Sequence, residues 1–99
     1  LRVLDERGVT VAIMTDGPIM APEMIVAQAG EAVRTGTPHD RALRMLTINP
    51  AMIAGLDGRI GSIEPGKDAD IALFAGAPAL DVDARCMRTI INGKTVYAR

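Results

Sequence analysis

The sequence has very little of several residue types on which protein sites commonly rely. Its 99 residues include two aromatics (Phe74 and Tyr97), one cysteine (Cys86) and one histidine (His39). A single cysteine excludes an intramolecular disulfide and a zinc site built from a cysteine cluster. Because aromatic side chains are scarce, we expect aliphatic residues and the six methionines to fill the core, since methionine adapts to irregular space.

Long apolar runs and an excess of charge are also absent. No apolar run approaches the ~18 residues of a membrane span, and no signal-peptide pattern is present. Eleven basic and twelve acidic residues give a net charge of −1, and no basic patch indicates nucleic-acid binding. The lone cysteine is compatible with a reducing compartment. We therefore expect a cytoplasmic protein that binds neither membranes nor nucleic acid.

The first third of the chain predicts an alternation of helix and strand. Residues 1–8 resemble the last turns of a helix that ends at Gly8, so we expect the chain to be a piece of a longer one. Val9–Met14 is a short, nearly continuous apolar run, typical of a strand in a parallel sheet. A helix is predicted over roughly Pro22–Thr35, where apolar residues recur at helical spacing.

Two further helices are predicted from their start signals. Thr37 suits the N-cap and Pro38 the first position of one helix. Asn49-Pro50 repeats this signal, and the short helix that follows ends at Gly55. Such a succession of helices fits the layer that packs outside a barrel.

From about Gly58 the sequence predicts short strands joined by turns. The strand patterns are Ile60–Ile63, Ile71–Phe74, Met87–Ile91 and Thr95–Tyr97. Glu64–Lys67 has Pro and Gly at its centre, which suits a type II turn. Asn92-Gly93 is the strongest short signal for a hairpin.

Asp16 is the leading candidate for chemistry. It directly follows the predicted strand and would lie at the carboxyl end of that strand, where the active sites of barrels assemble. A carboxylate there can ligate a metal or accept a proton during hydrolysis. The alternative is a structural residue in an Asx turn or N-cap, with Gly17-Pro18 making the turn. The spacing by itself favours the structural alternative.

Other polar residues are better explained by structure than by chemistry. His39 begins a predicted helix and is expected to face solvent, because a catalytic zinc needs about three protein ligands and no partners stand at ligand spacing. Cys86 lies in a strand pattern and is expected in the core, and Asp68 and Asp70 belong to a polar turn that enters a strand. The basic residues expected to be solvated are Arg59, Lys67 and Arg85.

Four segments, in this order and spacing, resemble the C-terminal portion of the amidohydrolase superfamily, in the branch that includes imidazolonepropionase. They are V-A-I-M-T-D-G-P at 11–18, A-L-R-M-L-T-I-N-P-A at 42–51, G-L-D-G-R-I-G-S-I-E-P-G-K-D-A-D-I at 55–71 and I-I-N-G-K-T-V-Y at 90–97. The resemblance covers nearly the whole chain. Any one segment is modest evidence, whereas four in order are strong evidence.

The resemblance implies an α/β fold. Residues 1–55 would form the C-terminal end of a (β/α)₈ TIM-type barrel, and residues 56–99 part of a small β-sandwich. The resemblance also implies one or two divalent metals, with zinc as the expected ion. Val9–Met14 would then be the eighth barrel strand, and Asp16 the aspartate that ligates the more buried metal and shuttles a proton. Relatives often carry His where this chain has Gly17, and their histidines from earlier strands have no counterpart here.

Two functions follow from these expectations. The first is a segment of a metal-dependent hydrolase that acts on carbon–nitrogen bonds of amides or cyclic amides, with the 99 residues alone inactive and unable to bind metal tightly. The alternative is a non-catalytic, β-rich binding or scaffold module derived from such an enzyme. In either case the apolar strands Val9–Met14 and Ile71–Phe74 would lack neighbours, which predicts self-association or a complementary chain.

Overall fold

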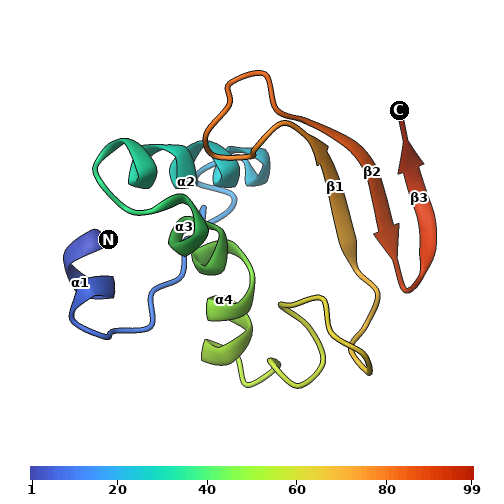
Figure 1. The fold of residues 1–99 in the computed structure, drawn as a ribbon, viewed down its shortest axis with the longest axis horizontal. Coiled ribbons are helices and arrows are strands. Elements are labelled where there is room, and N and C mark those ends of the chain that lie inside the picture. The colour runs from blue at the N-terminus through green and yellow to red at the C-terminus, as the bar shows by residue number, and fades with distance from the viewer.

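A computed structural model describes residues 1–99 as a group of helices followed by a separate sheet. The helices lie on one side in Figure 1 and the three strands on the other. The elements are α1 (Arg2–Glu6), the 3₁₀ turn η1 (Pro22–Met24), α2 (Ile25–Arg34), α3 (His39–Leu46), α4 (Ile48–Ile53), β1 (Ile71–Ala75), β2 (Arg85–Ile91) and β3 (Lys94–Ala98). None of the helices combines the length and apolar character needed to cross a membrane.

The hydrophobic core is confined to the helical side. Its buried residues are Val11, Ile13, Ala29, Ala42 and Met45. Ala29 and Ala42 are 0% exposed, and their small side chains allow α2 and α3 to approach each other closely. Met45, also 0% exposed, fills the remaining space, as expected from a composition poor in aromatics. Only 9 of the 99 residues are buried, so most apolar side chains lie outside this core.

The strand predicted at Val9–Met14 is wrong for this structure, because the segment has no strand beside it. It runs along the helices instead: the Ile13 N–H donates to the carbonyl of Met45 over 3.0 Å. The side chains of Val11 and Ile13 still point into the core, and each is 8% exposed. A strand needs a neighbouring strand to complete its ladder, and the sheet of this chain contains β1, β2 and β3 alone. The barrel edge expected from the resemblance is therefore not formed within these 99 residues.

The sheet is antiparallel, in the order β1–β2–β3. The predicted hairpin is confirmed. Asn92 and Gly93 have φ angles of 50° and 77°, as a two-residue type I′ turn requires, and Ile91 pairs with Lys94 beside them. Irregularities in register interrupt β1 against β2 and β2 against β3. Both β1 and β3 are edge strands, and every residue of β3 is exposed.

The strand predicted at Ile60–Ile63 is also wrong, since this segment forms bends that pack on α4. At Gly61 the φ angle is +94°, and a Cβ added there would lie 2.8 Å from the Cβ of Ala51. The chain thus approaches α4 too closely for any side chain at this position. The turn that follows is confirmed: the Lys67 N–H donates to the Glu64 carbonyl over 3.2 Å, and Gly66 has a φ of +91°.

The helix starts differ from those predicted. The N-cap of α3 is Pro38 rather than Thr37, and the Thr37 side chain is buried with no hydrogen-bond partner for its hydroxyl. The N-cap of α4 is Thr47, and Asn49, in the first turn of that helix, is buried. Neither Thr37 nor Asn49 caps a helix, although both residue types favour that position.

The loop 76–84 joins the sheet to the helical side at one end of the molecule (Figure 1). Ala79 lies against α2, where a Cβ added at Gly30 would be 3.4 Å from the Ala79 carbonyl oxygen. The Ala77 N–H donates to Asp81 Oδ2 over 2.8 Å and gives the loop a local fold. The loop is thus anchored at a glycine of α2 and not only at its ends.

Candidate functional site

Asp16 lies where the chain leaves the helices, just after residues 9–15, whose Val11 and Ile13 side chains point into the core. Val11 and Ile13 are buried, Met14 is 69% exposed, and Asp16 is exposed. Its φ angle is 53°, in the left-handed region that few residues other than glycine adopt. The carbonyl oxygen of Asp16 accepts a hydrogen bond from the Ile19 N–H over 2.9 Å, which closes the turn 16–19.

The carboxylate of Asp16 takes no part in holding this turn. The turn is closed by the backbone, and no hydrogen bond or ion pair joins the Asp16 side chain to another residue. The N-cap of the following helical turn is Ala21, without a side-chain cap. Asp16 is therefore neither the capping residue nor the Asx-turn residue of the structural alternative. Its carboxylate is free to bind a group outside the chain.

No cluster of metal-binding side chains surrounds Asp16. The chain contains no group of three or more His, Cys, Asp or Glu residues placed to hold a metal ion. Asp16 is a chemically suitable oxygen ligand for a divalent cation, but a catalytic zinc takes about three protein ligands. The 99 residues can therefore supply one ligand, Asp16, to a metal centre, but they do not form a complete centre by themselves.

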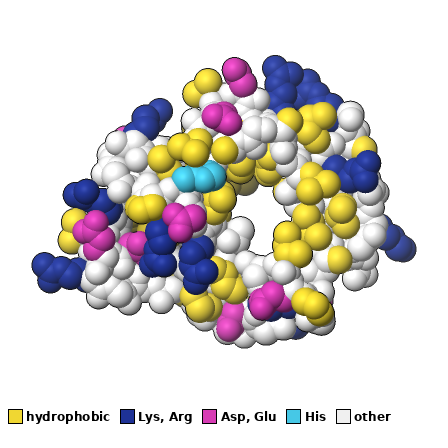
Figure 2. All heavy atoms as spheres, in the orientation of Figure 1, with side chains coloured by type: hydrophobic (Ala, Val, Ile, Leu, Met, Phe, Trp, Pro, Cys, Tyr) yellow, Lys and Arg dark blue, Asp and Glu magenta, His cyan; other side chains and the backbone are white.

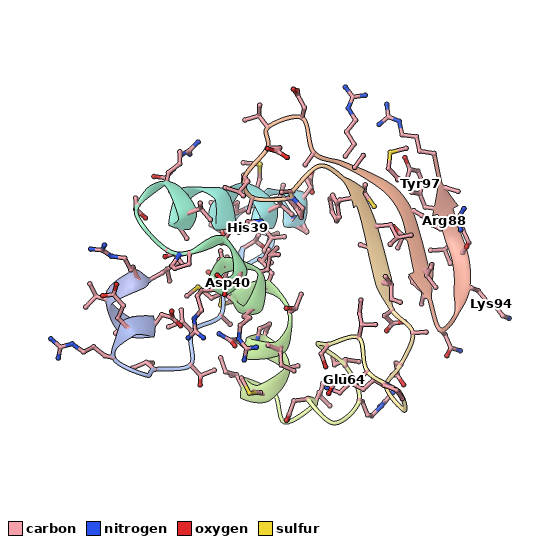
Figure 3. The ribbon with its side chains drawn as sticks, viewed as in Figure 1. His39, Asp40, Glu64, Arg88, Lys94 and Tyr97 are labelled. Atoms are coloured by element: carbon pink, nitrogen blue, oxygen red, sulfur yellow. The ribbon has the colours of Figure 1, made fainter.

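His39 has a structural contact instead of the solvent-facing position expected from the sequence. Its Nε2–H donates to the carbonyl oxygen of Pro78 over 2.6 Å, and the residue is half-buried. Figure 3 shows it on the helical side of the molecule, across from Tyr97 and Lys94 on the sheet. This bond fastens the loop 76–84 to α3. His39 thus contributes to packing between the two sides of the molecule.

Cys86 and the two aspartates near β1 also have structural contacts. Cys86 is partly buried in β2, and its thiol lies 3.5 Å from the Thr89 hydroxyl. Asp70 accepts a hydrogen bond from the Asn92 N–H over 2.8 Å, and Asp68 pairs with Arg59 at 2.8 Å. Both aspartates thus have the structural roles expected of a polar segment that enters a strand, whereas Arg59 is paired rather than simply solvated.

The bends of residues 60–67 contain a small polar cluster that sequence reasoning missed. Lys67, expected to be solvated, has a side chain only 13% exposed, and its Nζ lies 2.6 Å from Ser62 Oγ and 3.1 Å from Glu64 Oε2. Hydrogen bonds from Ser62 and from Lys67, together with the positive charge of Lys67, lower the pKa of the Glu64 carboxyl. Figure 3 shows Glu64 at the end of the molecule opposite the loop 76–84. The cluster holds the bends of residues 60–67 in shape.

A second ion pair missed by the sequence analysis joins α1 to α3. Arg41 binds Asp5 through both carboxylate oxygens, at 2.9 Å and 2.5 Å, and the Asp5 side chain is 9% exposed. The hydrogen bonds from Arg41 lower the pKa of the Asp5 carboxyl, against the smaller opposing effect of its burial. No local sequence pattern predicts an ion pair between two residues that are 36 positions apart. The contact fixes the first helix on the helical side.

An apolar groove separates the helices from the sheet. It encloses about 890 Å³, and its walls include Leu46 and Pro50 on the helices and Ile71 and Phe74 on β1. Figure 2 shows the same hollow at the centre of the molecule, rimmed by hydrophobic side chains. Asp16 is not among the residues that line it. The groove and the candidate carboxylate are therefore separate features.

Comparisons with known proteins define the class to which this fold belongs. The profile of the Amidohydrolase family matches residues 1–96, and the chain therefore belongs to that family. It is 32% identical over 96 residues to amidohydrolase tasK of Hapsidospora irregularis, matching 97% of this chain and 10% of that protein. It is also 32% identical to the imidazolonepropionase of Thermoplasma acidophilum, matching 99% of this chain and 25% of that protein. The resemblance found in the sequence is confirmed.

A solved structure shows the same arrangement. The crystal structure of an amidohydrolase from Thermotoga maritima MSB8 superposes with a TM-score of 0.90 and 44% sequence identity. The match covers 97% of this chain and 25% of that chain. The helices followed by a three-stranded sheet thus match one part of that amidohydrolase structure. The chain spans about a tenth to a quarter of the length of the relatives named here.

Proposed function

We propose that this chain is the segment of a metal-dependent hydrolase of carbon–nitrogen bonds that supplies Asp16 as a metal ligand and proton acceptor. The observation that carries the proposal is the free, exposed carboxylate of Asp16, which directly follows a segment buried against the helices. Its left-handed backbone conformation also supports the proposal, because strained conformations are concentrated at functional sites.

The proposed centre uses one oxygen ligand from this chain. Zinc is the expected ion, and the other ligands come from outside the 99 residues. A bound divalent metal supplies Lewis-acid activation of water. Asp16 would hold one side of the site, accept a proton at a carboxylate oxygen and return it to the leaving nitrogen. Its exposure leaves that oxygen accessible to substrate.

The substrate class proposed is an amide or a cyclic amide. The family match and the names of two relatives, an amidohydrolase and an imidazolonepropionase, support hydrolysis of a carbon–nitrogen bond. Specificity in barrel enzymes comes from the loops that follow the strands. We propose the turn 16–19 as one such loop. The substrate contacts of the other loops would come from outside the 99 residues.

The test is Asp16→Asn in the protein expressed from its complete reading frame. We expect turnover to fall by ~10²–10⁴-fold, because the change removes the proton acceptor and weakens metal ligation. The melting temperature of the metal-free protein should not change, since the Asp16 side chain bonds to no other residue. Asp57→Asn is the matched control: Asp57 is also exposed and unpaired. Near-normal turnover at full metal occupancy in Asp16→Asn would refute the proposal.

The alternative is a non-catalytic module derived from the same family. The lack of a metal-binding cluster within the 99 residues is compatible with this module, and equally with a segment that supplies one ligand. The sequence encoded upstream of Leu1 discriminates between the two functions. A His-x-His motif after a predicted strand there would support the enzyme, because it would supply further metal ligands.

A further inference from the structure

Asn49 is a buried polar residue. The sequence predicts that it starts a helix, but in the structure it caps no helix and bonds to a distant part of the chain instead. It is 5% exposed and lies in the first turn of α4. Its side-chain Nδ2–H donates to the backbone carbonyl of Val11 over 2.8 Å, across 38 residues. A buried amide with one long-range bond to a backbone carbonyl holds that carbonyl in place, because leaving the carbonyl unpaired is costly.

The segment that receives this bond has few other attachments. Residues 9–15 have no strand beside them, and the carbonyl of Met45 binds the Ile13 N–H over 3.0 Å. Val11 and Ile13 are thus held at two points, by Asn49 in α4 and by Met45 in α3. Two attachments on alternate residues fix both the position and the direction of an extended segment. Asp16 follows three residues beyond the second attachment.

We propose that Asn49 is a positioning residue for Asp16, acting through the Val11 carbonyl. The inference rests on the proposed role of Asp16 at a metal centre. Asn49 touches neither substrate nor metal in this role; it sets where the segment leaves the helical side and so where the carboxylate stands. The position requires a donor of this length, since an aspartate of the same shape would place a carboxylate oxygen against a carbonyl oxygen. This requirement explains an amide buried at a position where it caps no helix.

The test uses Asn49→Asp in the protein expressed from its complete reading frame. We expect kcat to fall by ~10–10²-fold, because a displacement of about 1 Å of a catalytic group has an effect of that size. KM should change less than kcat, and bound metal measured by elemental analysis should be retained less well against a chelator. Thr37→Val is the matched control, because it alters the other buried polar residue, whose hydroxyl has no partner. It should change neither kcat nor the retention of metal.

A double substitution separates positioning from general destabilisation. If Asn49 acts through Asp16, Asn49→Asp should reduce kcat by less than twofold when introduced into Asp16→Asn, because coupled residues are not additive. An undiminished loss in that background would overturn the positioning role and leave the proposed function intact. An Asp16→Asn variant with normal turnover would instead overturn the proposed function, and this inference with it.

A second variant keeps the test decisive if Asn49→Asp does not fold. Asn49→Ser retains a shorter donor and should show a smaller loss of kcat in the same direction. A variant whose melting temperature falls while kcat and metal retention remain within twofold of the parent protein would show that Asn49 is structural only.

Discussion

Gly61 lies so close to Ala51 of α4 that a Cβ added to the glycine would stand 2.8 Å from the Cβ of the alanine. The backbone of Ile48 closes the same space at 3.0 Å. Gly61 also has a φ of +94°, which side chains disfavour. This contact joins residues 60–63 to α4 and explains why they follow that helix instead of forming a strand.

Gly61→Ala should therefore destabilise the protein. We expect a loss of about 2 kcal/mol or more in the free energy of unfolding, since overpacking against backbone adds to the conformational strain. Gly58→Ala is the matched control, because nothing lies within 4 Å of a Cβ at Gly58 and its φ is not in the left-handed region. Denaturant unfolding followed by circular dichroism measures both. Equal stability of the two variants would contradict the packing described for Gly61.

Asp5 and Arg41 should make stability depend on pH at the acid end. Because its pKa is lowered in the folded chain, Asp5 contributes stability above its unfolded pKa of about 3.9, and this contribution is lost as the pH falls toward the folded value. The difference in unfolding free energy between the parent protein and Asp5→Asn should be constant near neutral pH and shrink below about pH 4. Glu6→Gln is the control, since Glu6 meets Arg2 only at 3.8 Å and in solvent. A difference that grows on acidification would contradict the assignment.

His39→Ala should affect the loop 76–84 rather than catalysis. We expect turnover within twofold of the parent protein, and a loss of about 1 kcal/mol in stability from the broken bond to Pro78. Hydrogen exchange of the amides in the loop should become faster, while exchange in β2 and β3 should stay unchanged. A large loss of turnover would mean that His39 has a role in the site.

The 99 residues produced alone should have no hydrolase activity and no tight zinc site. Asp16 supplies one ligand, whereas a catalytic zinc uses about three. Calorimetric titration with zinc is the measurement. Stoichiometric, tight binding that disappears in Asp16→Asn would contradict the expectation, because it would show that the chain completes a metal site by itself.

The same isolated chain should self-associate. Only 9 of its 99 residues are buried, and large apolar side chains are open to solvent, including Val82 at 97%, Ile19 at 83% and Ile63 at 82%. The edge strands β1 and β3 add unpaired backbone groups that can recruit another chain. Sedimentation at low micromolar concentration checks this. A monomer with a cooperative melt would show that the helical core and the sheet are sufficient on their own.

Local chemistry explains the parts of the molecule that were predictable from the amino-acid sequence. Asn92-Gly93 makes its hairpin because both residues tolerate positive φ angles, and Glu64–Lys67 turns because Gly66 does. The helix around Ala29 follows from apolar residues at helical spacing. Asp16 was identified because an acid after an apolar run is readable in sequence. Each of these features depends on residues close together in the chain.

Long-range contacts decided the rest. Val9–Met14 has the apolar pattern of a strand, but a pattern cannot supply the neighbouring strand that a ladder requires. Asn49 carries a helix-start signal, yet its amide binds a carbonyl 38 residues away. Asp5 resembles an ordinary surface charge until the fold places Arg41, 36 residues away, beside it. The sequence by itself thus determined the turns, the helices and the candidate carboxylate. Only the tertiary structure decided which groups are buried and which residues they contact, as with Asn49 and the Val11 carbonyl, because those partners are distant in the chain.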